Sequence, residues 1–149
     1  MLTFNADEVT HGIQLAVAPV FLLTAVSGMI GVIAGRLARI IDRARLVEDR
    51  ARESSDAVFL QRAFTELSEL RLRGRLANGG IALLTFCAFL IGLTIIVLFV
   101  GETTAFQISR WAVGGFLAGV VSFLLALLCF LTETLIATRL LNFHLPGKG

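Results

Sequence analysis

Long uncharged stretches alternate with charged segments along this 149-residue chain. Residues 12–35, 76–101 and 111–132 contain no Asp, Glu, Lys or Arg. A helix needs about 20 apolar residues to cross a hydrocarbon core of roughly 30 Å, and a core helix of a soluble protein rarely runs that far without a charge. The pattern therefore predicts an all-α integral membrane protein with three transmembrane helices at these positions.

The segment between the first two stretches, residues 36–75, has the apolar spacing of helices. It contains no Pro, and no Gly before Gly74, so nothing in it forces the first transmembrane helix to stop at the membrane surface. Apolar residues recur at helical spacing on both sides of residues 54–56. They are Leu37, Ile41, Ala44, Val47 and Ala51, followed by Leu60, Phe64, Leu67 and Leu70. We expect the first two transmembrane helices to extend into an antiparallel helical hairpin with arms about 27 Å long.

The composition agrees with a membrane location. Hydrophobic residues make up 56% of the chain and charged residues 16%, against about 25% charged residues in a typical soluble domain. The two cysteines, Cys87 and Cys129, both lie in uncharged stretches. We interpret them as small buried hydrophobic residues rather than as a disulfide or a metal-binding pair.

Basic residues are distributed unevenly, which predicts the orientation. The hairpin holds ten of the thirteen, residues 102–110 hold one, and the N-terminus holds none. The positive-inside rule therefore places the hairpin and the tail, residues 133–149, in the cytoplasm, and the N-terminus and residues 102–110 outside. Because the first stretch is preceded by Asp7 and Glu8 rather than by Lys or Arg, we expect a retained helix and not a cleaved signal peptide.

The arginines of the hairpin share it with seven acids. Four pairs of opposite charge have the four-residue spacing that brings side chains together on a helix. They are Arg45 with Asp49, Glu48 with Arg52, Arg62 with Glu66, and Glu69 with Arg73. This self-neutralising surface, which offers no interleaved aromatic platform for bases, argues against a nucleic-acid partner.

No catalytic or metal-binding motif stands out. His11 and His144 are expected on opposite sides of the membrane, and no nucleophile has a base nearby in the sequence. Asp7, Glu8 and His11 could form a metal-binding turn, but such residues at a helix start more often form a cap and a solvated face. We expect no enzyme activity and no cofactor or metal.

Small and polar residues form a stripe in the first stretch, and a second small series occurs in the third. They are Gln14, Thr24, Ser27, Gly28, Gly31 and Gly35, and then Gly115 and Gly119. Small residues four positions apart allow helix backbones to approach closely in lipid. Both sets have two interpretations: packing within one chain, or a subunit interface or pore wall in a homo-oligomer.

Three charges are expected at one membrane boundary. Arg36, Arg75 and Glu133 flank the three uncharged stretches at the same predicted depth. We expect Glu133 to pair with Arg36 or Arg75 and to fix the helix ends, although an ionisable residue at membrane depth also raises the alternative of ion binding or gating.

Two sequence motifs resemble a known family. Residues 19–23 read PVFLL, and residues 36–45 read RLARIIDRAR, a long run of unusual composition. With these motifs the chain resembles, over nearly its whole length, a bacterial membrane family known as domain of unknown function 2721. The resemblance implies a three-helix protein of the bacterial inner membrane and supplies no catalytic residues.

The function predicted from this architecture is a small homo-oligomeric membrane protein with an ion-conducting pore lined by the first helix. In that hypothesis Asp7 and Glu8 form an outer acidic ring that concentrates cations. The alternative is a non-conducting scaffold or regulatory protein that uses the cytoplasmic hairpin as a docking surface.

Overall fold

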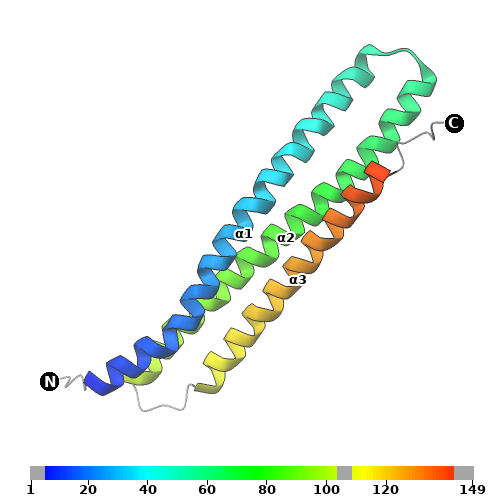
Figure 1. Cartoon of the computed structure of the whole chain (residues 1–149). Helices are drawn as coiled ribbons and strands as arrows, with labels where there is room; N and C mark the ends of the chain where they lie inside the picture. Colours follow the sequence, from blue (N-terminus) through cyan, green and yellow to red (C-terminus); the bar gives the residue numbers. More distant parts are fainter. Residues whose placement is uncertain (1–5, 104–108, 143–149) are drawn as a thin grey trace. The chain divides into compact units, whose positions relative to one another are not determined.

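A computed structural model of the chain describes residues 6–103 and 109–142. These residues form three α-helices and no strand: α1 (Ala6–Glu53), α2 (Ala57–Thr103) and α3 (Ser109–Asn142) (Figure 1). By length and composition, each helix contains a span that could cross a membrane, within Ala16–Glu53, Ala57–Gly101 and Arg110–Thr138. The prediction of an all-helical protein with three candidate transmembrane helices is confirmed.

The helices extend beyond the uncharged stretches of the sequence. α1 has 48 residues and α2 has 47, more than twice the roughly 20 needed to cross a bilayer. α1 continues through Pro19 without interruption, and α3 continues to Asn142, ten residues past the predicted end of the third span at residue 132. The predicted loop 102–110 is shortened at both ends, because α2 includes Thr103 and α3 begins at Ser109; residues 104–108 lie outside the described part.

Only residues 54–56 separate α1 from α2. The Asp56 carboxylate accepts a hydrogen bond from the Val58 amide at 3.0 Å, and the Ser54 hydroxyl accepts one from the Asp56 amide at 3.3 Å. Short polar side chains that bind free amides in this way start helices, so Asp56 acts as the N-cap of α2. The chain therefore reverses at the interruption that the sequence pattern indicated.

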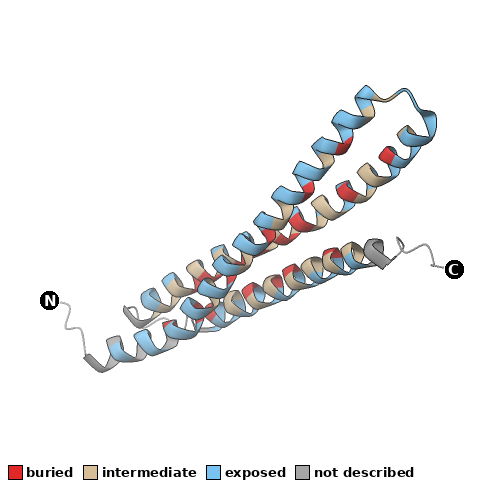
Figure 2. Ribbon diagram, turned by 45° about the horizontal axis from the view of Figure 1, so that its top comes forward, coloured by how far each residue is buried: buried red, intermediate tan, exposed pale blue. Residues whose placement is uncertain are grey.

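Buried residues recur every seven positions along each helix, and Figure 2 shows them as red positions that repeat along the ribbon. A seven-residue repeat is the spacing of left-handed coiled coils. The buried positions are Val26, Ile33, Ile40 and Val47 in α1, then Ala63, Leu70, Ala77, Leu84 and Ile91 in α2, and Ala112, Gly119, Ala126 and Glu133 in α3.

This repeat corrects two predicted core positions in the hairpin. Ile41 and Phe64 are 42% and 67% exposed, whereas Ile40 and Ala63 are buried. The predicted stripes placed the next core residue four positions after Leu37 and after Leu60. In the structure, the buried residue lies three positions after each of them. Apolarity alone did not separate Ile40 from Ile41, and it favoured Phe64 over the smaller Ala63.

The helices pack as two compact units, which we describe separately. Unit 1 consists of Met1–Ile30 and Ala82–Leu125, and unit 2 of Gly31–Ile81 and Ala126–Gly149. In unit 2, Arg43 of α1 contacts Glu66 of α2, while the α1 residues Leu37 and Ile40 lie near Gly74 further along α2. Residues later in α2 contact residues earlier in α1, so the two arms are antiparallel, as predicted for the hairpin.

In unit 1, the glycines of α3 allow a close approach to α2. A Cβ atom on Gly115 would lie 2.8 Å from Thr94 Oγ1, and one on Gly119 would lie 2.8 Å from Ile91 Cδ1. The Ser122 hydroxyl, one turn further, donates to the Leu83 carbonyl at 2.8 Å. Gly115 and Gly119, which the sequence also offered as interface or pore residues, therefore pack within the chain.

Candidate functional site

Unit 2 brings one carboxylate into contact with two guanidinium groups from other helices. Glu133 of α3 is 1% exposed. Arg73 of α2 donates to its Oε1 from both Nε, at 3.0 Å, and Nη2, at 2.9 Å. Nη2 of Arg36, from α1, lies 2.9 Å from Oε2. We call Arg36, Arg73 and Glu133 the buried charge cluster.

Arg36 is also positioned by its neighbours on α3. Its Nη1 donates to Thr134 Oγ1 at 3.1 Å, and this hydroxyl in turn donates to the Phe130 carbonyl at 2.9 Å. The guanidinium carbon lies 5.2 Å from the centroid of the Phe130 ring, a distance at which a cation is attracted to the ring face. With its guanidinium held in this way, Arg36 contacts Glu133 as an ion pair, since Oε2 makes no hydrogen bond of good geometry among the described residues.

The buried charge cluster is not neutral. Two guanidinium groups share one carboxylate, and both arginine side chains keep some exposure, 27% for Arg36 and 20% for Arg73, against 2% for Glu133. A carboxylate buried without partners would be strongly destabilising, and the two arginines provide the partners for Glu133. The exposed sides of the arginines leave positive charge facing outward.

The sequence predicted one of the two arginine partners. The Arg36–Glu133 pair was expected, but the partner from α2 is Arg73 and not Arg75, which is exposed. The two positions are about 200° apart around a helix, so they point to nearly opposite sides. The prediction used depth in the membrane alone. Arg73 is spaced seven residues from the buried Gly80 and fourteen from the buried Cys87, a pattern that becomes visible once the buried face of α2 is known.

Most of the ion pairs formed by charged residues of the hairpin within the described part join two different helices, and fewer lie within one helix. Of the four predicted pairs, the described residues form Glu48 with Arg52, at 2.6 Å. Glu66 instead binds Arg43 of the other arm at 2.7 Å, and Arg73 binds Glu133. The hydrogen bond that Arg52 donates to the Glu48 carboxylate also raises the pKa of Arg52.

The stripe on α1 lies on the surface of the chain. Its predicted members Gln14, Thr24, Ser27, Gly28, Gly31 and Gly35 are all exposed. Beyond the helix's own backbone, a Cβ atom on any of these three glycines would meet nothing within 4 Å. No described residue therefore packs against these glycines, which favours the subunit-interface and pore interpretations over packing within the chain, and both stay predictions.

The remaining predicted residues are the two N-terminal acids and the two cysteines. α1 includes Asp7 and Glu8, but their side chains lie outside the described part of the structure. Both cysteines are free thiols, and Cys87 is buried. Among the described residues, no group of three or more His, Cys, Asp or Glu side chains could hold a metal ion.

Comparison with other proteins identifies the chain at the level of a family. No curated protein and no solved structure matches it. Residues 16–143 match the model of one family; they include α1 from Ala16 onward, all of α2 and α3, and every member of the buried charge cluster. The chain belongs to this family, described as a protein of unknown function (DUF2721).

Proposed function

We propose that this chain is a homo-oligomeric, non-enzymatic scaffold of the membrane, whose subunits associate through the exposed small-residue face of α1. The observation that carries this proposal is the open space beside Gly28, Gly31 and Gly35. Lipid tails are as apolar as leucine, so helices associate in a membrane mainly where small residues let their backbones come close. A second copy of the chain supplies a helix with the same small face.

The face has the geometry that such a contact needs. Gly28 is two residues from the buried Val26, and Gly31 and Gly35 are each two residues from the buried Ile33. A spacing of two residues corresponds to a rotation of about 200° around a helix. The small face is therefore opposite the buried face. Its steps of four, three and four residues from Thr24 to Gly35 match the spacing of the buried stripe, and a neighbouring helix can follow them at a small crossing angle.

Thr24 favours a dry contact over a water-filled pore. Its hydroxyl donates to the Val20 carbonyl at 3.3 Å, so this polar group already has a partner within its own helix. Val17, Val20 and Phe21 are also exposed on the N-terminal part of α1. A surface of glycines, apolar side chains and an internally bonded hydroxyl suits helix packing better than hydration.

A pore lined by α1 is the second candidate function. It is favoured by the exposure of Gln14 and Ser27, which would face an aqueous path if several copies surrounded an axis. Asp7 and Glu8 would then form the outer acidic ring.

The proposed setting is the bacterial inner membrane, with the N-terminus outside and the hairpin and C-terminus in the cytoplasm. The ten arginines between residues 36 and 75 support this orientation. The hairpin then extends the scaffold into the cytoplasm as a docking surface for a protein partner, and the seven acids among its arginines argue against nucleic acid as that partner.

The double variant Gly31→Leu/Gly35→Leu tests the interface. The structure leaves room for both side chains in the single chain, so the helices should fold while the close approach between copies is blocked. The matched control is Gly92→Leu/Gly114→Leu, at two glycines on α2 and α3 that also have nothing within 4 Å.

We expect the unmodified protein and the control to be oligomers of one size, and the Gly31→Leu/Gly35→Leu variant to be monomeric with unchanged helical circular dichroism. Native mass spectrometry from detergent measures the subunit number. A monomeric unmodified protein, or an oligomer that survives both leucines, would contradict the proposal.

A further inference from the structure

Beside the buried charge cluster, unit 2 contains a groove between α1 and α2 with a volume of about 370 Å³. Four arginines line it together with two apolar residues. They are Arg36, Arg39, Ile40 and Arg43 of α1, and Leu70 and Arg73 of α2. The volume lies in the range of small-ligand sites, roughly 300 to 1,000 Å³.

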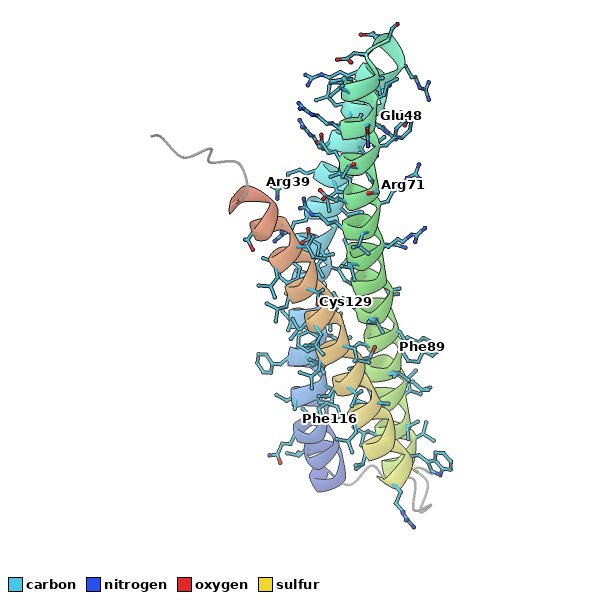
Figure 3. All side chains as sticks on the ribbon, turned by 90° about the vertical axis from the view of Figure 1, so that its right-hand side faces the viewer. Arg39, Glu48, Arg71, Phe89, Phe116 and Cys129 are labelled. Carbon is cyan, nitrogen blue, oxygen red and sulfur yellow. The ribbon has the colours of Figure 1, made fainter. Side chains whose placement is uncertain are left out.

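The carboxylates around the groove do not neutralise its arginines. Glu133 binds Arg36 and Arg73, and Glu66 binds Arg43, so four guanidinium groups share two carboxylates. Arg39 contacts neither acid. Among the described residues, its one hydrogen bond runs from Nε to the Gly35 carbonyl at 3.3 Å. Counted over these contacts between described residues, the groove has two more guanidinium groups than carboxylates, and Arg39, marked in Figure 3, has donors that no described residue occupies.

The remaining donors suit a phosphate group. A guanidinium group has five N–H donors in a planar fork, and it binds phosphate oxygens two at a time. Neither terminal nitrogen of Arg39, nor Nη1 of Arg43 or of Arg73, has a hydrogen-bond partner among the described residues. Ile40 and Leu70 are buried at 6% and 7% exposure, and this apolar floor lowers the local dielectric constant and strengthens the attraction for an anion.

The position of the groove along α1 indicates the source of the phosphate. Arg36 is the first charged residue after the uncharged stretch that ends at Gly35. At 1.5 Å per residue, Arg39 lies about 5 Å and Arg43 about 10 Å further along the helix. The headgroup layer on each side of a bilayer is roughly 5 to 8 Å thick. With the edge of the hydrocarbon core at Arg36, as the sequence predicts, the donors of Arg39 lie at the depth of the lipid phosphates.

We propose that this groove binds the phosphate group of an anionic phospholipid. Arg39 supplies a cation that no described carboxylate pairs with, Arg43 and Arg73 add donors from the two walls, and the fatty acyl chains extend along the apolar surface below Arg36. The buried charge cluster then has a second role, because Glu133 holds Arg36 and Arg73 at the edge of the lipid site.

The test substitutes Arg39 with Gln and uses Arg71→Gln as the matched control. Arg71 is an exposed arginine of α2 that Figure 3 shows pointing outward, and it does not line the groove. Both variants lose one positive charge. Arg39→Lys keeps the charge and removes the planar fork, so it separates charge from geometry and serves as a second variant.

Each protein is placed in nanodiscs of phosphatidylcholine with a minor fraction of phosphatidylglycerol, and lipids that stay bound per chain are counted by native mass spectrometry. We expect the unmodified protein to retain phosphatidylglycerol preferentially, Arg39→Gln to lower its affinity about fivefold, and Arg71→Gln to change it less than about twofold. The affinity of the Arg39→Lys variant for phosphatidylglycerol should lie between those of the unmodified protein and the Arg39→Gln variant.

Three outcomes would overturn the proposal: no preference for phosphatidylglycerol in the unmodified protein, equal losses in the Arg39 and Arg71 variants, or displacement of the lipid by millimolar inorganic phosphate. The last result would assign the groove to a free anion. Because bound lipid is counted per chain, none of these results depends on the oligomeric state.

Discussion

Glu133 lies at a position of the seven-residue buried repeat of α3 where the preceding repeats have small residues. The preceding buried positions on α3 are Ala112, Gly119 and Ala126. At the next position, α2 presents Arg73 and α1 presents Arg36, so a carboxylate can satisfy two guanidinium groups at once. An ion pair of this kind sets the register of the helices, because an apolar substitute could slide along them without losing a specific partner.

Substitution of Glu133 by Gln should destabilise the protein. The amide keeps the size of the side chain but removes the negative charge that binds both arginines. Their partial exposure lets them turn toward water or headgroups and recover some of the loss, so we expect about 1 to 3 kcal/mol of destabilisation. Reversible unfolding in mixed micelles measures the free energy; an unchanged value would show that the cluster contributes nothing to stability.

Arg73 and Arg75 provide a comparison with the same chemical change at two sites. Arg73→Gln removes both hydrogen bonds to Glu133 Oε1, and we expect it to destabilise the protein by about 1 to 3 kcal/mol. Arg75 is exposed, so Arg75→Gln should change the stability by less than about 0.5 kcal/mol. Thermal melting followed by circular dichroism gives both values. Equal effects of the two variants would contradict the assignment of Arg73.

At the scale of the helices, the same small-residue motif has two different uses. On α3, Gly119 lies in the buried repeat, and on α1, Gly28, Gly31 and Gly35 lie outside it. The exposed parts of the spans are apolar, and Figure 3 shows Phe89 of α2 pointing away from the other helices. Which glycines pack within the chain is therefore decided by the phase of the seven-residue repeat.

Leucine at Gly119 or at Gly28 separates these two uses. At Gly119 even the first side-chain atom would lie 2.8 Å from Ile91 Cδ1, so Gly119→Leu overfills the contact and should destabilise the chain by about 1 to 3 kcal/mol. Gly28→Leu meets nothing within 4 Å and should leave the stability of the monomer unchanged. Unfolding at high detergent dilution measures the monomer. A loss at Gly28 as large as at Gly119 would contradict the packing described here.

How far the sequence predicts this fold depends on the kind of information each feature needs. The three spans and the turn at residues 54–56 follow from hydropathy and polar residues, which act locally, and they were predicted. The choice of Ile40 over Ile41, or of Arg73 over Arg75, depends on which face meets another helix. That information is distributed over the repeats of all three helices, and local spacing within one helix did not contain it.

At the scale of the whole molecule, the orientation in the membrane can be tested directly. A reporter inserted at Ser55, in the exposed connection between α1 and α2, and another fused after Gly149 should both be cytoplasmic. A reporter at the N-terminus should be external. The ten basic residues of the hairpin provide the physical reason, since positively charged segments stay on the cytoplasmic side. Accessibility labelling in intact cells shows on which side of the membrane each reporter lies. The opposite labelling pattern would contradict the predicted orientation.

Ion flux distinguishes the scaffold from the pore. Because Thr24 is bonded within its own helix and Gly28, Gly31 and Gly35 suit close contact, we expect liposomes with the unmodified protein to show no more cation flux than empty liposomes. Flux above that background would contradict the dry interface. If such flux then fell when Asp7→Asn and Glu8→Gln were combined, and fell more at low salt, the acidic ring would be acting through a screened field, and the pore would replace the scaffold.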